Sequence, residues 1–375
     1  MSEAEATRQG VRGKKPGREA VPGEGTRAVT GQRASGARRW RRKRRGEQPM
    51  VPRADFTSYY GKPILNAPVW EARDIAGYLF LGGLAGGSSL LAAGADLTGR
   101  PGLSRAAKAG AAGAITLSLA ALVHDLGRPA RFINMMRVFK VTSPMSVGTW
   151  LLSGYAPAAG VAAATALTGR LPKVGAAATV GAALLGPAVA AYTAALIADT
   201  AVPAWHDGYR EMPFVFTGSG AMAAGGLGLL AGPAEESGPA RNLALAGQVV
   251  EMLAFERMTR RIGMVAEPYH TGRGGAYVRA GQVLGALGAA GATLSGTPAV
   301  PSGRPRRLIT ALSGAALIGA SIATRWGVFH AGMASARDPK YTVVPQRKRL
   351  NERAAAKVEP APSPSPQAPL TPPPA

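Results

Sequence analysis

Eight apolar segments, each about 20 residues long, constrain this chain most, because a helix of that length spans the hydrocarbon core of a bilayer. Short connections containing Pro, Gly, Arg or Asp separate them. The pattern predicts an all-α membrane bundle with about eight transmembrane helices. The segments fall at residues 75–95, 106–124, 145–168, 174–198, 213–232, 241–258, 280–299 and 307–328.

A soluble helical protein rich in Ala and Gly is the competing interpretation. Helices of soluble proteins carry a polar stripe along one side, and segments 106–123 and 176–198 show no charged stripe. Small residues also have a use in lipid, where they let helix backbones approach closely. The stretch GYLFLGGLAGGSS contains two such overlapping pairs, Gly82/Gly86 and Gly83/Gly87. We therefore expect a tightly packed bundle in the membrane.

The two ends of the chain differ from this apolar middle. Residues 1–49 hold 14 Lys and Arg against five Glu and almost no large apolar residues, a composition typical of disorder. Met50 is an alternative translation start, which would leave this segment out. The C-terminal end is rich in Pro. The predicted organisation is a disordered basic tail at 1–52, a membrane domain at 53–348 and a disordered Pro-rich tail at 349–375.

A formal net charge of +23 raises the question of a nucleic-acid partner. The basic residues lie in the tails and in loops between apolar segments, as they do around membrane helices, so we expect contact with membrane lipid and none with nucleic acid. An even number of spans places both basic termini on one side, predicted to be the cytoplasmic side of the cell membrane. One loop departs from this bias, because Arg304, Arg306 and Arg307 lie on the opposite side.

The residue inventory excludes several kinds of chemistry. The chain has no Cys, so its own side chains form no Fe–S site, thiol nucleophile or disulfide. Its four His residues lie at segment ends or in loops, whereas a membrane b-haem needs two facing His inside the bundle. No motif has metal-ligand spacing. We expect no haem, no metal and no catalytic residues, and a chain without activity on its own.

Polar side chains at the edges of the apolar segments are the functional candidates, because placing them in lipid is costly. Asp74 and Tyr78 share a helix face and could hold a quinone headgroup, or be a dipole-favoured Asp and an interfacial Tyr. Tyr192 and Asp199 also share a face, and Asp199 is either a proton-transfer residue or a helix end. Glu251 is a further candidate for proton transfer.

The connection from His124 to Trp150, HDLGRPARFINMMRVFKVTSPMSVGTW, carries more charge than a short helix connection needs. His124 and Asp125 could exchange protons near neutral pH, or simply end a helix. The basic residues that follow could hold a partner subunit or lipid phosphates, or only fix the topology. They are Arg128, Arg131, Arg137 and Lys140.

Several motifs resemble the NrfD/polysulfide-reductase membrane-subunit family over roughly residues 55–348. The resemblance implies an eight-helix subunit of a bacterial oxidoreductase complex that binds menaquinone or ubiquinone and carries no haem. It also implies electron exchange with a 4Fe–4S ferredoxin-like subunit, which serves a molybdopterin catalytic subunit. The similar stretches are YYGKP (59–63), LGGLAGGSSLLAAGADLTGRP (81–101), HDLGRPARFINMMRVFKVTSPMSVGTW (124–150), AWH (204–206), AEPYHTGRGG (266–275) and GMASARDPKYTVVPQR (332–347).

The resemblance also selects among the candidate residues. In the family, a polar residue and a His ahead of the GLAGG motif line the quinone pocket, which places Tyr78 at the position of the His and Asp74 or its neighbour at the other. A family Tyr in the fourth span corresponds to Tyr192. The loop beginning at His124 falls near the docking surface or the proton path. Two other functions stay open: a secondary transporter or proton-translocating protein, and a passive anchor without a quinone site.

Overall fold

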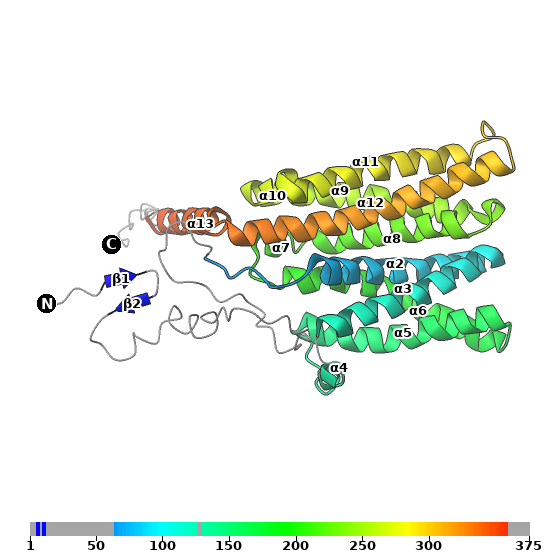
Figure 1. Ribbon diagram of the computed structural model, residues 1–375, viewed down its shortest axis with the longest axis horizontal. Helices are drawn as coiled ribbons and strands as arrows, with labels where there is room; N and C mark the ends of the chain where they lie inside the picture. The colour runs from blue at the N-terminus through cyan, green and yellow to red at the C-terminus, as the bar shows by residue number, and fades with distance from the viewer. Residues whose placement is uncertain (1–4, 8–9, 13–63, 127–129, 359–375) are drawn as a thin grey trace, which may run out of the picture.

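A computed structural model describes residues 5–7, 10–12, 64–126 and 130–358 of the chain. Over these residues, eight long helices lie side by side in an elongated bundle (Figure 1), and each overlaps one of the eight predicted segments. They are α2 (Ala72–Leu97), α3 (Pro101–Asp125), α5 (Pro144–Thr168), α6 (Pro172–Ala198), α8 (Met212–Ala231), α9 (Gly238–Ile262), α11 (Gly272–Ser295) and α12 (Arg304–Arg337).

Six of these helices are long and apolar enough to cross a membrane, namely α2, α3, α5, α6, α8 and α12. The all-helical membrane fold is therefore confirmed. Helices α9 and α11 are less apolar, because α9 contains Glu251 and Glu256 and α11 contains Arg273 and Arg279. The count of eight spans stays a prediction. In its favour, Leu253 of α9 is 61% exposed and Leu287 of α11 is 63% exposed, which suits side chains that face lipid.

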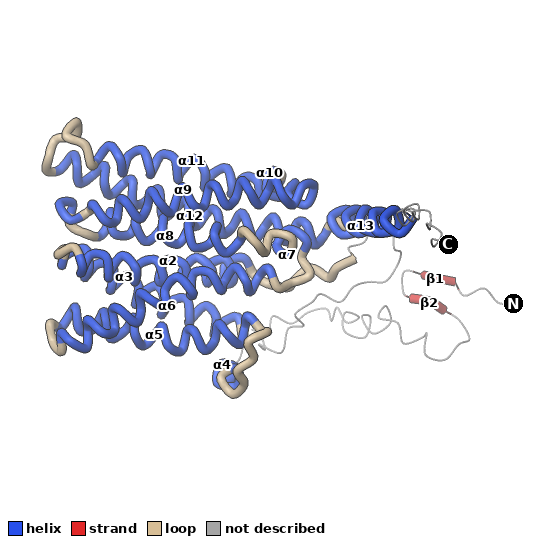
Figure 2. Tube along the Cα trace, turned by 180° about the vertical axis from the view of Figure 1, so that it is seen from behind, coloured by secondary structure: helices blue, strands red, loops and turns tan. Residues whose placement is uncertain are grey.

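Shorter elements gather at the end of the bundle where α2 begins and α12 ends (Figure 2). The last of them, α13, runs to Val358 and so enters the segment predicted to be a disordered tail from 349. Its sequence there, NERAAAK, favours helix, and the Pro-rich stretch begins only afterwards. The elements are α4 (Ala130–Met135), α7 (Pro203–His206), η2 (Gly263–Ala266), α10 (Glu267–His270) and α13 (Lys340–Val358).

At the opposite end of the bundle, η1 (Ala234–Glu236) joins α8 to α9. Near the N-terminus, β1 (Glu5–Thr7) pairs antiparallel with β2 (Gly10–Arg12). The rest of the predicted basic tail, and residues 359–375 of the C-terminal tail, lie outside the described residues. Disorder in these undescribed parts of the tails therefore stays a prediction.

Helix α2 is the centre of the packing, because it contacts α3, α6 and α8. Its two predicted small-residue pairs face two different helices. A Cβ added at Gly86 would lie 2.9 Å from the carbonyl carbon of Gly186 in α6, and one added at Gly87 would lie 3.0 Å from that of Gly220 in α8. These helices therefore meet backbone to backbone, as small residues permit in lipid. The predicted tight packing is confirmed.

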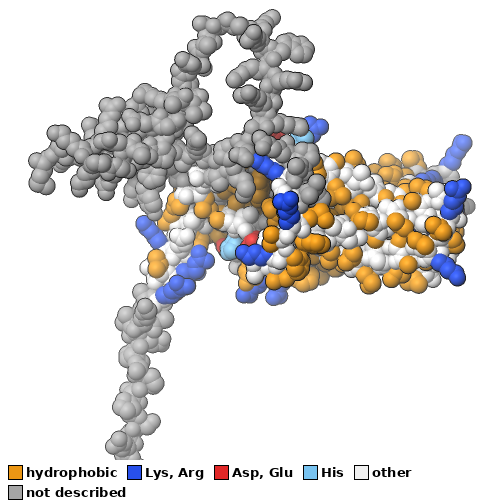
Figure 3. All heavy atoms as spheres, turned by 90° about the horizontal axis from the view of Figure 1, so that it is seen from below, with side chains coloured by type: hydrophobic (Ala, Val, Ile, Leu, Met, Phe, Trp, Pro, Cys, Tyr) orange, Lys and Arg blue, Asp and Glu red, His pale blue; other side chains and the backbone are white. Residues whose placement is uncertain are grey.

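The surface of the bundle has the polarity of a membrane protein. On the face shown in Figure 3, hydrophobic side chains cover the middle of the bundle, and Lys and Arg side chains gather toward its two ends. Exposed leucines along the helices include Leu117 of α3 and Leu184 of α6. An apolar belt between two charged ends is the pattern expected of a protein that spans a bilayer.

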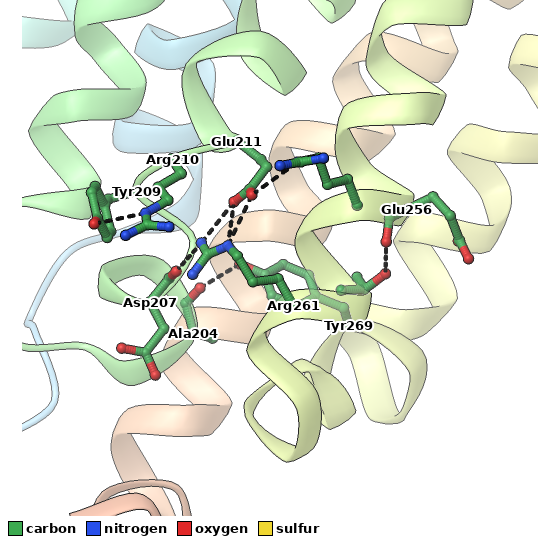
Figure 4. Close-up of polar contacts among 10 residues, drawn as sticks. Ala204, Asp207, Tyr209, Arg210, Glu211, Glu256, Arg261 and Tyr269 are labelled. Carbon is green, nitrogen blue, oxygen red and sulfur yellow. Dashed lines mark hydrogen bonds and ion pairs between the residues drawn. The ribbon is translucent and has the colours of Figure 1, made fainter. Parts of the chain in front are cut away.

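A buried acidic residue joins the loops at the end near α13 (Figure 4). Glu211, just before α8, is buried and accepts hydrogen bonds from Arg261 Nε at 2.8 Å and Nη2 at 2.7 Å. Arg261, in the last turn of α9, also donates to the carbonyl oxygen of Asp207. The Tyr269 hydroxyl donates to the carbonyl oxygen of Ala204 at 2.9 Å. The cluster thus holds α7, α8, α9 and α10 together.

We expect Glu211→Gln to lower the stability of the protein by about 2 kcal/mol, because a buried hydrogen bond to a charged group is lost. The Arg261 guanidinium holds the pKa of the Glu211 carboxyl below its usual value. The ionised form is therefore favoured by folding, and its contribution is complete above about pH 4.5 and is lost as the pH falls further. Thermal unfolding of the purified protein at several pH values measures both effects.

Glu256→Gln is the matched control. Glu256 pairs with Arg260 on the exposed side of α9, the helix that also carries Arg261. Exposed pairs contribute little, so this change should cost less than about 0.5 kcal/mol. Equal losses in the two variants would show that Glu211 has no special structural role.

Candidate functional site

A cavity of about 210 Å³ lies between α2, α3, α5 and α6, at the end of the bundle near α4. Its walls are mainly apolar and include Trp70, Met145 and Leu152. A small number of polar groups among apolar walls is the usual composition of a ligand site. The polar side chains that line it are Asp74, Tyr78, Asp125, Arg131, Thr149 and Tyr192.

Three helices bring the predicted quinone-binding residues and one predicted proton-transfer residue to this cavity. Asp74 and Tyr78 lie one turn apart at the start of α2, and both line the cavity, as their spacing predicts. Tyr192 reaches it from α6 and Asp125 from the last residue of α3. Tyr78 and Tyr192 are buried. Groups that are more than a hundred residues apart in sequence therefore share one cavity.

The Tyr192 hydroxyl is buried and has no hydrogen-bond partner in the described part of the chain. Most buried polar atoms in proteins are hydrogen-bonded, so an unpartnered hydroxyl requires an explanation. Because this hydroxyl belongs to a residue that lines the cavity, a bound polar molecule would supply the missing partner.

Helix α5 fixes the position of the Tyr192 ring. The sequence SPMSVG determines where α5 begins. Ser143 is the N-cap, its side chain accepts a hydrogen bond from the Ser146 N–H, and Pro144 is the first residue of the helix. One turn later, the place of a Cβ on Gly148 is already filled by the Tyr192 ring. The sequence motif containing Gly148 was part of the family resemblance, but no role for Gly148 was predicted. Trp70 and Thr149 were also not predicted to line the site.

His124 and Asp125 are both exposed at the end of α3, and Asp125 lines the cavity. Nδ1 of His124 lies 3.1 Å from Oδ2 of Asp74, and the His124 side chain is 53% exposed. Asp74 therefore contacts both the cavity and a residue that reaches the surface. This arrangement can carry a proton between the cavity and the outside.

The other two predicted proton-transfer residues lie elsewhere. Asp199 is exposed at the C-terminal cap of α6 and is not among the residues that line the cavity. Glu251 is buried in α9, where its Oε1 accepts from the Thr324 hydroxyl at 2.6 Å. The buried Arg325 lies nearby and donates to the carbonyl oxygen of Phe216 at 2.7 Å. Roles for Asp199 and Glu251 in proton transfer stay predictions.

The four predicted docking residues have different surroundings. Arg128 lies outside the described residues. Arg131 lines the cavity and donates to the carbonyl oxygen of Leu126 at 3.2 Å. Arg137 and Lys140 are exposed in the connection between α4 and α5. Within the described residues, no group of three or more His, Asp or Glu side chains is arranged to hold a metal ion.

Comparison with known proteins identifies the family. The family described as polysulphide reductase, NrfD, matches residues 65–335, a range that begins before α2 and ends near the end of α12. No curated protein matches the chain. The match covers well over half of the sequence and includes every residue that lines the cavity. The chain is therefore a multi-pass membrane protein that belongs to the NrfD, polysulphide reductase family.

Proposed function

We propose that this chain is the quinone-interacting membrane subunit of a bacterial oxidoreductase complex, with the quinone headgroup in the cavity beside Asp74, Tyr78 and Tyr192. The observation that carries the proposal is the meeting of these three side chains around a cavity where the Tyr192 hydroxyl has no partner in the described residues. The volume is below the roughly 300 Å³ typical of small-molecule pockets, which suits a ring-sized headgroup and leaves an isoprenoid tail outside.

The side chains divide the work of such a site. A bound menaquinone or ubiquinone would supply two-electron, two-proton chemistry. The Tyr78 and Tyr192 hydroxyls would donate hydrogen bonds to the quinone oxygens, and the apolar walls would keep bulk water away from the ring. Oδ2 of Asp74 and Nδ1 of His124 hold and pass the protons, and the exposed face of His124 exchanges them with water. Asp125 adds a second carboxylate to the cavity wall.

Electrons would arrive from, or leave to, a 4Fe–4S ferredoxin-like subunit docked at the end of the bundle that contains the cavity and α4. This subunit in turn would contact a molybdopterin catalytic subunit, and the membrane chain alone would have no activity. The exposed surface between α4 and α5 suits a protein partner, because Arg137 and Lys140 flank the exposed Val138 and Phe139. Charged and aromatic groups together are typical of protein interfaces.

Quinone affinity of the purified full chain tests the site directly. A short-chain menaquinone analogue bound in the cavity would quench the fluorescence of Trp70, which lines it. We expect Tyr78→Phe and Tyr192→Phe each to weaken binding about fivefold, because each removes one hydrogen bond of about 1 kcal/mol. Trp70→Phe should remove part of the quenching, which would place the analogue beside this wall, and calorimetry measures the affinity of each variant independently of fluorescence.

Tyr155→Phe is the matched control. Tyr155 is also buried, but its hydroxyl bonds to Ser89 at 2.8 Å and it does not line the cavity. Its replacement should leave quinone affinity unchanged. If neither Tyr78→Phe nor Tyr192→Phe changes the affinity, the proposed pocket is wrong, and a passive membrane anchor becomes the better account. A secondary transporter would instead move its substrate across the membrane of proteoliposomes that contain this chain alone.

A further inference from the structure

A second hollow lies at the opposite end of the bundle, far along the helices from the cavity. It is a groove of about 870 Å³ between the end of α8, η1 and the first turns of α12. Three arginines in the first turn of α12 line it, and they are the residues that depart from the predicted charge bias between the two sides of the membrane. The lining residues used below are Glu235, Arg304, Arg306, Arg307, Leu308 and Ala311.

One of these arginines, Arg307, has a structural role in the hydrogen bonds at the end of α8. The Arg307 guanidinium donates to the carbonyl oxygens of Leu230 at 2.7 Å and Gly232 at 2.8 Å. These carbonyls belong to the last turn of α8 and its cap, which have no partner within the helix. Arg307 therefore closes the end of α8.

Arg306 is only partly accounted for. Its Nη2 donates to the carbonyl oxygens of Thr297 and Val300, but its Nε is buried without a partner in the described residues. Arg241 in α9 does not line the groove, but the charges of Arg306 and Arg241 act on each other. An anion beside Arg306 would therefore be attracted by a second positive charge behind it.

The remaining charges in the groove leave it basic. Arg304 is exposed at the start of α12. Glu235 lines the groove and is the acidic residue among its lining. The neighbouring Glu236 has a structural role, because its Oε2 accepts a hydrogen bond from the Leu103 N–H at 2.7 Å and so caps α3. An anion in the groove therefore meets more positive than negative charge.

Apolar side chains continue the groove toward the middle of the bundle. Leu308 and Ala311 line it on α12, and the exposed Leu312 follows one turn further. Leu230 is exposed on the facing end of α8. The site therefore combines an anion-binding end at the membrane boundary with an apolar surface that runs into the lipid, and this combination fits a molecule with one anionic and one apolar part.

We propose that this groove binds an anionic phospholipid, with the headgroup phosphate beside Arg304 and Arg306 and an acyl chain along Leu308 and Ala311. The basic first turn of α12 then serves lipid recognition, which explains its departure from the charge bias. The site is independent of the quinone cavity, so the two proposals stand or fall separately.

Titration of the purified full chain with phosphatidylglycerol in neutral-detergent micelles tests the groove, because a ligand that binds the folded state raises the melting temperature. Phosphatidylglycerol should raise it, whereas phosphatidylcholine with the same acyl chains and inorganic phosphate should not. Replacing two arginines in Arg304→Gln/Arg306→Gln should weaken the apparent phosphatidylglycerol affinity by tenfold or more, since each basic residue near an anionic lipid contributes about 1 kcal/mol.

The control is Arg170→Gln/Lys173→Gln, which removes the same charge from the exposed connection after α5 and the first turn of α6, at the same end of the bundle. It should leave the affinity within about twofold. Because Arg306 also bonds backbone carbonyls, Arg304→Gln alone is a second variant that keeps the fold, and about fivefold weaker binding is expected. Equal loss in the control, or equal stabilisation by phosphatidylcholine, would overturn the proposal. Equal stabilisation by inorganic phosphate would assign the groove to the free anion instead.

Discussion

Gly86→Ala should prevent the bundle from assembling correctly, although it adds only one methyl group. The new Cβ would lie 2.9 Å from the carbonyl carbon and 3.3 Å from the Cα of Gly186. These are backbone atoms of α6, so no side chain can rotate away, and the two helices must separate. Overpacking a well-filled core costs about 1–3 kcal/mol even where side chains can adjust. We expect a larger loss here, seen as little folded protein in detergent and a sharply lower melting temperature.

Gly94→Ala is the matched control on the same helix. A Cβ at Gly94 meets nothing within 4 Å, and alanine favours helix over glycine by up to about 1 kcal/mol. This variant should be as stable as the original protein or slightly more so. If Gly86→Ala and Gly94→Ala unfold at the same temperature, α2 and α6 do not make the close approach described above.

The helices of the membrane domain were predictable because their information is local. A run of about 20 apolar residues identifies a membrane helix without reference to any other part of the chain. All eight predicted segments overlap long helices, and at least one glycine of each small-residue pair of α2 meets another backbone. The sequence could not show that Gly82/Gly86 and Gly83/Gly87 face different helices, since this depends on the order in which helices pack.

The site was predictable only where it depends on local spacing, and not where it depends on how the helices pack. Asp74 and Tyr78 share a face because they are four residues apart, and the structure places both at the cavity. The contact between Asp74 and His124 joins residues fifty positions apart, so no spacing rule reveals it. The role of Gly148 depends on the Tyr192 ring that fills its Cβ position. Such a role is visible only after α5 and α6 are placed side by side.

The position of α2 links stability and function in this bundle. Its first turns carry Asp74 and Tyr78, and its middle packs against both α6 and α8. The backbone contact between Gly86 and Gly186 lies on the same two helices that bring Tyr78 and Tyr192 together. The close approach that small residues allow therefore sets the distance between the two tyrosines.

Gly148→Ala should abolish most quinone binding while the protein stays folded. Its new Cβ would lie 2.7 Å from Cδ2 and 3.1 Å from Cζ of Tyr192, so the Tyr192 ring has to move. The obstacle is a side chain, unlike the backbone that meets Gly86, and the open space beside it is the cavity itself. The ring would enter this space and reduce a volume that is already only ring-sized. We expect at least tenfold weaker binding of the menaquinone analogue, with a stability loss of about 1–3 kcal/mol.

Gly160→Ala controls for adding a methyl group to α5, since a Cβ there meets nothing within 4 Å. It should leave binding unchanged, and stability should stay equal or rise slightly, as for Gly94→Ala. Combining Gly148→Ala with Tyr192→Phe provides a sharper test, because mutations that act through the same group are not additive. If Gly148→Ala works by displacing Tyr192, the hydroxyl no longer contributes, and the double variant should bind the analogue about as weakly as Gly148→Ala alone. A full additional fivefold loss in the double variant would show that the Tyr192 hydroxyl still acts, and that the cavity has not been closed by its ring.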